Sequence, residues 1–185
     1  MLEHDELSWR CELTRFLAGA CRVAVLGVGN PIRGDDGAGT YVAFLLRSFF
    51  RRRPSRRGTK PPSSWLSIPA GAVPENYLSL VTRFRPTHVI VVDAFHQGAA
   101  PGTVSIIPTS SIEGLSLSSH RLPLGLIRDY LLLSGVPHQV YVGIEPHCVD
   151  LGATMTRPVI RSSGKVARAI ARLARCPDQA RSSRI

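Results

Sequence analysis

Short apolar runs alternate with longer amphipathic segments along this chain. The runs that predict β-strands lie at residues 22–29, 65–68, 87–92, 102–107 and 140–144. Between them, apolar positions recur at helical spacing in residues 40–50, 74–84, 123–133 and 162–174. Because strands and helices alternate, we predict an α/β fold. Its central sheet is expected to be twisted and largely parallel, with helices on both faces in a three-layer sandwich.

One domain accounts for most of the 185 residues. We expect residues 21–176 to form a single α/β domain and residues 1–20 to form an N-terminal extension. The apolar positions of this extension that share one helical face are Leu7, Cys11, Leu13 and Leu17. The prolines, serines and basic residues of segment 51–64 predict a flexible, solvated insertion, and residues 177–185 predict a disordered basic tail.

The net charge of +10 is unevenly distributed. The excess of basic residues, nearly all of them arginines, lies in residues 51–60 and 157–184. A basic nucleic-acid-binding module is therefore one alternative for the function. However, aromatic residues make up only 6% of the chain and none lies within the basic run 51–57, so no platform for stacking bases is visible. A solvated loop is the favoured interpretation of that run, and nucleic acid is disfavoured as a partner.

The expected location is the cytoplasm. The first 13 residues carry four acidic side chains and lack the order of a secretory signal, and no apolar run approaches the ~20 residues of a membrane span, so no membrane association is expected. The four cysteines form no CxxC pair. They are expected to be ordinary reduced thiols and not zinc ligands or disulfides.

The loop after the first predicted strand has glycine spacings that resemble nucleotide-binding motifs. Gly27 and Gly29 begin a dinucleotide fingerprint, but Ile32 stands where its third glycine belongs. Gly29 and Gly34 have the spacing of a phosphate-binding loop, but two aspartates follow in place of Lys-Ser/Thr and would repel a triphosphate. The loop is better suited to a cation.

Carboxylates and an imidazole are expected at one edge of the sheet. Asp35 and Asp36 follow the first strand, Asp93 ends the strand 87–92, and His120 closes a later loop. Sites in open parallel sheets lie beyond the carboxyl ends of the strands. Oxygen and imidazole ligands suit nickel or zinc, and three protein ligands would leave positions for water or substrate.

Each of these residues also has an ordinary structural interpretation. Either Asp35 or Asp36 could cap the helix that follows, Asp93 could be a hydrogen-bonded structural carboxylate, and His120 could be an ordinary loop residue. The same holds for His96 and His147. The chain has neither HExxH nor GxSxG, so the common zinc-peptidase and serine-hydrolase motifs are absent from the sequence.

Five stretches together resemble the hydrogenase maturation endopeptidases. They are VLGVGNPIRGDDGAG (25–39), AGAVPEN (70–76), VIVVDAFHQGAAPGTV (89–104), SSHRLPLGLI (118–127) and VGIEPHCVDLGATMTRPV (142–159). The resemblance extends over about residues 22–175. It implies an α/β domain that acts as an aspartyl endopeptidase-like hydrolase. Such enzymes remove a C-terminal extension from the large-subunit precursor of nickel–iron hydrogenases after nickel has been inserted.

The resemblance also implies roles for individual residues. Asp36, Asp93 and His120 would contact nickel and act in catalysis. The nickel would arrive with the precursor, so the free enzyme could be metal-free. The chain departs from the family at Ala70, where an acidic residue often occurs, and its basic insertion and tail lie outside the shared pattern. A metal-binding maturation chaperone without peptidase activity is the second alternative.

Overall fold

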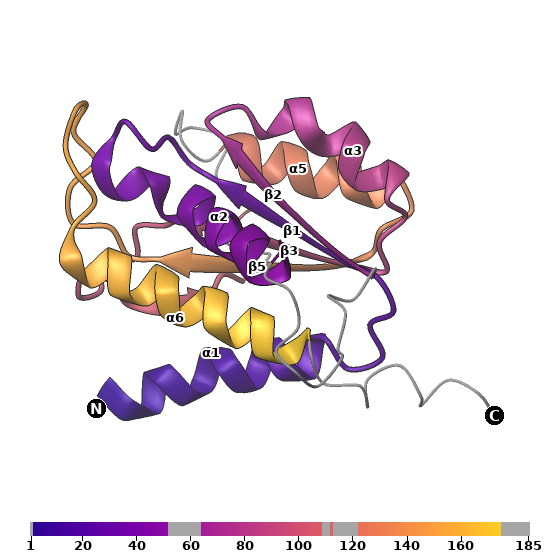
Figure 1. The fold of residues 1–185 in the computed structure, drawn as a ribbon, viewed down its shortest axis with the longest axis horizontal. Coiled ribbons are helices and arrows are strands. Elements are labelled where there is room, and N and C mark those ends of the chain that lie inside the picture. The colour runs from indigo at the N-terminus through magenta and orange to yellow at the C-terminus, as the bar shows by residue number, and fades with distance from the viewer. Residues whose placement is uncertain (1, 52–63, 109–111, 113–121, 175–185) are drawn as a thin grey trace.

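The computed structural model describes residues 2–51, 64–108, 112 and 122–174 (Figure 1). The predicted ligand His120, the basic tail 177–185 and residues 52–63 of the basic insertion lie outside these residues. The expectations attached to them therefore stay predictions.

A five-stranded sheet forms the centre of the molecule. Its strands are β1 (Val23–Val28), β2 (Trp65–Gly71), β3 (His88–Ala94), β4 (Val104–Ile106) and β5 (His138–Ile144). They lie in the order β2-β1-β3-β5-β4. All neighbours are parallel except β4, which pairs antiparallel with β5 at the edge. The predicted α/β fold with a largely parallel sheet is confirmed.

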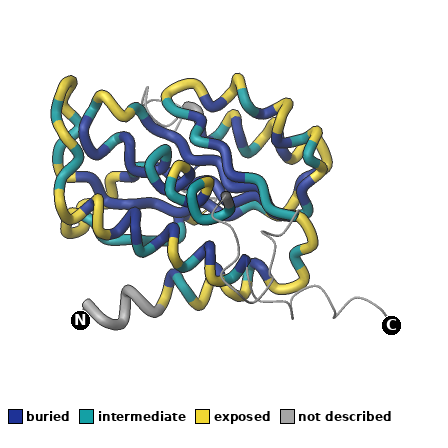
Figure 2. Tube along the Cα trace, viewed as in Figure 1, coloured by how far each residue is buried: buried dark blue, intermediate teal, exposed yellow. Residues whose placement is uncertain are grey.

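Helices cover both faces of the sheet. They are α1 (Leu2–Phe16), α2 (Ala38–Arg51), α3 (Leu78–Arg83), α5 (Leu122–Leu133) and α6 (Arg157–Leu173), with the short 3₁₀ helices η1 (Gly34–Gly37) and η2 (Pro74–Tyr77) before α2 and α3. One core lies between the sheet and α1, α2 and α6, and a second lies between the sheet and α3 and α5. Buried residues accordingly form the middle of the molecule (Figure 2), as a three-layer sandwich requires.

The N-terminal helix packs against the domain by a face that includes Leu13 and Leu17, as predicted, but Trp9 and not Cys11. Trp9, Leu13 and Leu17 are buried in the first core, whereas Cys11 is exposed. The spacing of the three buried residues is four, which places them along one side of a helix. Large apolar area decides which side is buried, so Trp9 faces the core and Cys11 faces solvent.

Two predicted helices have different starts in the structure. Helix α6 begins at Arg157 and not at residue 162, because Pro158 fits the first turn of a helix and Val159 reaches the core. The segment predicted as a helix over 74–84 begins as the 3₁₀ helix η2 and becomes α-helical only at Leu78. No helix in the described part of the chain is long and apolar enough to cross a membrane.

Close backbone packing brings the loop after β1 against the end of β3. A Cβ at Gly39 would lie 2.0 Å from the Val92 carbonyl oxygen and 2.5 Å from that of Val28, so helix α2 begins directly over β1 and β3. Gly29 has a φ of 110° and a Cβ there would lie 1.7 Å from the Asp36 carbonyl oxygen. Only glycine permits both approaches, and together they place Asp36 beside the end of β3.

Candidate functional site

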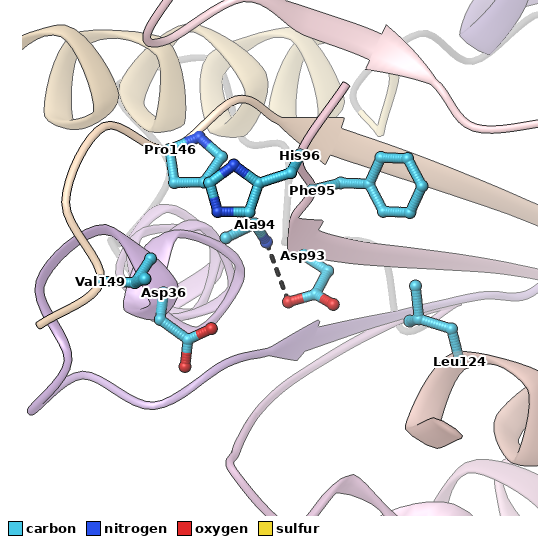
Figure 3. A pocket seen from close by; sticks show the side chains of 8 residues that line it. All are labelled: Asp36, Asp93, Ala94, Phe95, His96, Leu124, Pro146 and Val149. Carbon is cyan, nitrogen blue, oxygen red and sulfur yellow. Dashed lines mark hydrogen bonds between the residues drawn. The ribbon is translucent and has the colours of Figure 1, made fainter. Parts of the chain in front are cut away.

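A pocket opens at the carboxyl edge of the sheet, where β1 and β3 end side by side (Figure 3). It encloses about 90 Å³, which is room for a hydrated ion or one side chain but not for a nucleotide. The described residues that line it are Asp36, Asp93, Ala94, Phe95, His96, Leu124, Pro146 and Val149. They come from four segments of the chain, and most of them are apolar.

Asp93 is a buried titratable group of the pocket whose pKa is strongly shifted. It stands near the end of β3, only 7% exposed, and its Oδ1 accepts a 2.8 Å hydrogen bond from the Ala94 N–H. Burial raises the pKa of Asp93, the charge of Asp36 raises it further, and the Ala94 hydrogen bond lowers it, for a result of about 8. The carboxyl group therefore holds a proton at neutral pH until a cation or a change in solvation favours its charged form.

Asp36 approaches the same pocket from the η1 turn. The residue is half-buried, and its Oδ2 accepts a 2.7 Å hydrogen bond from the Asn30 N–H. Figure 3 shows its carboxylate and that of Asp93 on adjoining walls of the pocket. The sequence prediction that carboxylates after two separate strands would converge is thus confirmed for these two residues.

Asp35 has a different environment although it is the next residue in the chain. It is fully buried, and its carboxylate accepts hydrogen bonds from the N–H groups of His147, Cys148 and Thr156 and from the Thr156 hydroxyl. Burial opposes ionisation, but these four hydrogen bonds outweigh it and hold the pKa of Asp35 below its usual value. Asp35 therefore joins the loop after β5 to the loop after β1.

The capping interpretation of the two aspartates is wrong. The helix that follows them is α2, and none of the groups that donate hydrogen bonds to these carboxylates belongs to it: Asn30 donates to Asp36, and His147, Cys148 and Thr156 donate to Asp35. Asp35 and Asp36 lie inside the 3₁₀ turn, where successive residues point about 120° apart. One side chain therefore faces the 147–156 loop and the other faces the pocket.

The third predicted ligand, His120, lies outside the described residues, so its place relative to the pocket stays a prediction. Within the described ranges, no three His, Cys, Asp or Glu side chains are grouped so that they could hold a metal ion. The described part of the site contains two carboxylates, and carboxylate oxygens are suitable ligands for a divalent cation.

Sequence reasoning missed a third buried carboxylate near the pocket. Glu145 is 3% exposed, its Oε2 accepts a 2.7 Å hydrogen bond from the Gln97 N–H, and its Oε1 lies 3.4 Å from Nδ1 of His96. It fixes the loop after β3, from which His96 lines the pocket. The signal was present in the sequence, since Glu145 directly follows the strand 140–144 just as Asp93 follows the apolar run 89–92.

Two other candidate positions have no part in the pocket. The side chain of His147 is exposed, and the residue contributes its N–H to Asp35. Ala70 is buried in the second core beside η2 and α3, so it is a packing residue. Among the cysteines of the described residues, Cys11, Cys21 and Cys148 are free thiols, as predicted.

A proton-holding carboxyl group beside a second carboxylate is an arrangement suited to acid–base chemistry. A group whose pKa is near 8 can both accept and release a proton near neutral pH. The same pair can instead bind a divalent cation, because a cation would displace the proton from Asp93. The apolar walls formed by Phe95, Leu124 and Val149 reduce the access of water and strengthen either interaction.

Comparison with known proteins adds independent information. A family model described as hydrogenase maturation protease matches residues 55–173. The hydrogenase 3 maturation protease of Escherichia coli K12 is 32% identical over 136 residues, which is 73% of this chain and 80% of that protein. A putative hydrogenase maturation protease of Methanocaldococcus jannaschii is 30% identical over 129 residues, or 70% of this chain and 75% of that protein.

Solved structures agree with these matches. The crystal structure of the [NiFe] hydrogenase maturation protease HycI from Thermococcus kodakarensis KOD1 superposes with a TM-score of 0.72 at 25% identity, covering 89% of this chain and 99% of that one. The solution structure of the endopeptidase HycI from Escherichia coli gives a TM-score of 0.65 at 29% identity, covering 80% of this chain and 87% of that one.

Proposed function

Because the chain belongs to the hydrogenase maturation protease family, we propose that it removes the C-terminal extension from the large-subunit precursor of a nickel–iron hydrogenase. The chain is a protease, and the reaction is hydrolysis of one peptide bond. The proposed partner is the precursor itself. The proposed signal for cleavage is nickel already bound in the precursor, which makes the metal part of the substrate.

The observation that supports this proposal is the convergence of Asp36 and Asp93 on one pocket. Two carboxylates from separate loops provide the hard oxygen donors that a divalent ion accepts, and His120 is the proposed imidazole donor. A precursor-bound nickel ion could supply Lewis acidity toward water or the scissile carbonyl group, or it could serve only to position the peptide.

The residues of the chain have proposed roles in either case. Asp36 and Asp93 would orient the end of the precursor at the pocket. A cation near Asp93 would favour its ionised form, whose carboxylate could take a proton from the attacking water. The water oxygen then bonds to the carbonyl carbon, the carbon–nitrogen bond breaks, and the leaving amine takes the proton that the carboxyl group held. The apolar neighbours Phe95 and Leu124 would exclude competing water.

The test is cleavage of a nickel-loaded precursor, followed by mass spectrometry. We expect the wild-type protein to produce the shortened subunit, and D36N, D93N and H120A to lose at least about 100-fold in rate while remaining folded. The matched control is D129N, which neutralises an exposed aspartate on α5. Full activity of D93N would refute the site assignment.

A second arm of this experiment tests the role of nickel. Nickel-free precursor is expected to remain uncut, and efficient cleavage under chelation would refute nickel as the signal. The chaperone alternative predicts that the wild-type protein binds the loaded precursor without shortening it, so the mass of the product distinguishes the two functions.

A further inference from the structure

Helix α6 has one face made of basic residues. Arg157, Arg161, Arg168 and Arg172 are exposed, and Lys165 is half-buried. Their spacing of three or four residues places all five on one side of the helix. No Asp or Glu occurs in α6, and the four arginines have no acidic partner among the residues whose side chains the structure describes, which leave out residues 2–7 of α1. We call these five residues the α6 basic face.

The α6 basic face is rigidly mounted. Val159, Val166 and Ile170 on the opposite side of the helix are completely buried in the core, and α6 packs beside α2 on the sheet (Figure 1). From Arg157 to Arg172 the face extends about 22 Å, at ~1.5 Å per residue. An extended peptide of about seven residues has the same length.

The first turn of α6 is connected to the pocket in two ways, through the loop that precedes it and through hydrogen bonds. The loop that leads from β5 to α6 contributes Pro146 and Val149 to the pocket wall. Thr156, the residue before α6, donates two hydrogen bonds to Asp35, which directly precedes Asp36. The loop that forms part of the pocket wall therefore leads into the first turn of α6, and Asp35 ties that turn to the residue next to Asp36.

We propose that the α6 basic face docks an acidic segment of the hydrogenase precursor, an inference that rests on the proposed function. A row of cations without interspersed acids attracts carboxylates and gives the encounter its orientation. Charge pairs on an exposed face change association more than they change the chemical step. The face therefore contributes to recognition of the precursor and not to bond cleavage.

The same observations disfavour two other classes of partner. A helix that lies on a membrane needs an exposed apolar face, but Val159, Val166 and Ile170 are buried in the core and Ile160 is the one large apolar residue of α6 that is exposed. Helix α6 carries no aromatic residue, so it offers no surface on which unpaired bases could stack. Continuity with the pocket favours the molecule whose end enters that pocket.

The experiment compares two charge-reversed proteins of equal net charge. R161E/R168E changes the α6 basic face, and the control R83E/R85E reverses two exposed arginines in and just after α3, on the other face of the sheet. The nickel-loaded precursor is the substrate. We expect the KM of R161E/R168E to rise about tenfold with kcat within about twofold of wild type, and that of the control to change less than about twofold.

Two further measurements of KM test the role of charge, one at different salt concentrations and one with a variant that removes charge without reversing it. The KM of the wild-type protein is expected to rise between low salt and about 0.5 M NaCl, and this dependence should be weaker in R161E/R168E. R161Q/R168Q, which removes charge without reversing it, should give an intermediate KM, and circular dichroism checks that all three variants are folded.

Several outcomes would overturn the proposal. The proposal is refuted if R161E/R168E has the KM and the salt dependence of wild type. It is also refuted if the KM of the control R83E/R85E rises as much as that of R161E/R168E. Tight binding of a 20-base-pair DNA duplex or of anionic phosphatidylserine vesicles that only R161E/R168E abolishes, with KM for the precursor unchanged, would assign the face to that partner instead. Failure of the wild-type protein to cut the precursor would refute the proposed function. In that case the α6 basic face is still tested by comparing how tightly wild type and R161E/R168E bind the same precursor, measured by fluorescence anisotropy.

Discussion

Asp35 accepts two hydrogen bonds from Thr156, one from its N–H at 2.6 Å and one from its hydroxyl at 2.9 Å. These bonds connect the turn after β1 to the start of α6 across 121 residues of sequence. The adjacent Asp36 faces the pocket and accepts its hydrogen bond from Asn30 within its own loop. Two neighbouring identical residues thus have separate tasks, one holding the loops together and the other contributing a carboxylate to the site.

Replacing Asp35 should destabilise the protein. D35A would leave the buried N–H groups of His147, Cys148 and Thr156 without their acceptor, so we expect the free energy of unfolding to fall by about 3 kcal/mol. T156V removes only the hydroxyl donor and should cost about 1 kcal/mol. Urea unfolding measures both, and equal stability of D35A and wild type would contradict the assignment.

The hydrogen bonds of Asp35 also predict that the stability of the protein depends on pH in the acid range. Because the pKa of Asp35 is lower in the folded protein than its ordinary value of 3.8, the ionised carboxylate contributes stability above that value. This contribution is lost as the pH falls through the lower folded pKa. D35N should therefore have a shallower loss of stability below about pH 4 than wild type, measured by thermal unfolding across that range.

Asp93 should make stability depend on pH in the opposite direction to Asp35. The Asp93 carboxyl group has a pKa of about 8 in the folded protein, whereas in the unfolded chain its pKa is near the ordinary value of 3.8. The folded state therefore loses stability as the pH rises between those values, on the order of a few kcal/mol in total. We expect metal-free D93N to be more stable than metal-free wild type at pH 8.5, with the difference shrinking toward pH 4.5.

The coupling between the two pocket carboxylates can be measured directly. The charge of Asp36 is the second cause of the raised pKa of Asp93, after burial. D36N should therefore lower the pKa of Asp93, while D129N should leave it unchanged. Carbon-13 NMR titration of the labelled aspartate carboxyl groups reports the value, and an unshifted pKa in D36N would show that the two groups do not interact.

Two glycines offer a matched pair for testing the packing of the site. A Cβ at Gly39 would overlap the carbonyl oxygens of Val92 and Val28, whereas a Cβ at Gly125 in α5 has no heavy atom within 4 Å. G39A should lose more than about 3 kcal/mol of stability because α2 must move away from the sheet. G125A should gain about 0.5–1 kcal/mol from reduced backbone freedom in the unfolded chain. Similar melting temperatures of the two variants would contradict the close approach.

A histidine pair at the opposite edge of the sheet predicts a second dependence on pH. The ring of His88 stacks on that of His138 with centroids 4.7 Å apart, and Phe16 meets it edge-on. Burial lowers the pKa of His88, and the charge of His138 lowers it further. The unfolded chain therefore takes up a proton below about pH 6.5 that the folded state resists, and stability falls as the pH falls.

The variant H88F should remove this response. It keeps a ring between Phe16 and His138 but cannot be protonated, so its free energy of unfolding should change less between pH 7.5 and 5.5 than that of wild type. Urea unfolding at each pH measures the difference. Equal slopes for H88F and wild type would show that the pair does not govern stability in this range.

Local sequence patterns determined most of the secondary structure and the edge of the sheet at which the site lies. Apolar runs of strand length and amphipathic segments specify an α/β order, and parallel strands necessarily end at one edge. The sequence pattern alone therefore places Asp36 and Asp93 at the same edge, where the structure has both lining one pocket.

Tertiary packing decided what the local pattern leaves open. Sequence could not assign Asp35 and Asp36 to different tasks, because their directions depend on a 3₁₀ turn and on the loop after β5, whose His147 lies 112 residues after Asp35. It did not identify Trp9 as a core residue or Glu145 as a buried partner of Gln97, since each role is set by what the rest of the chain places against that residue. Periodicity is a property of neighbours along the chain, whereas burial, pKa and hydrogen-bond partners are properties of neighbours in space.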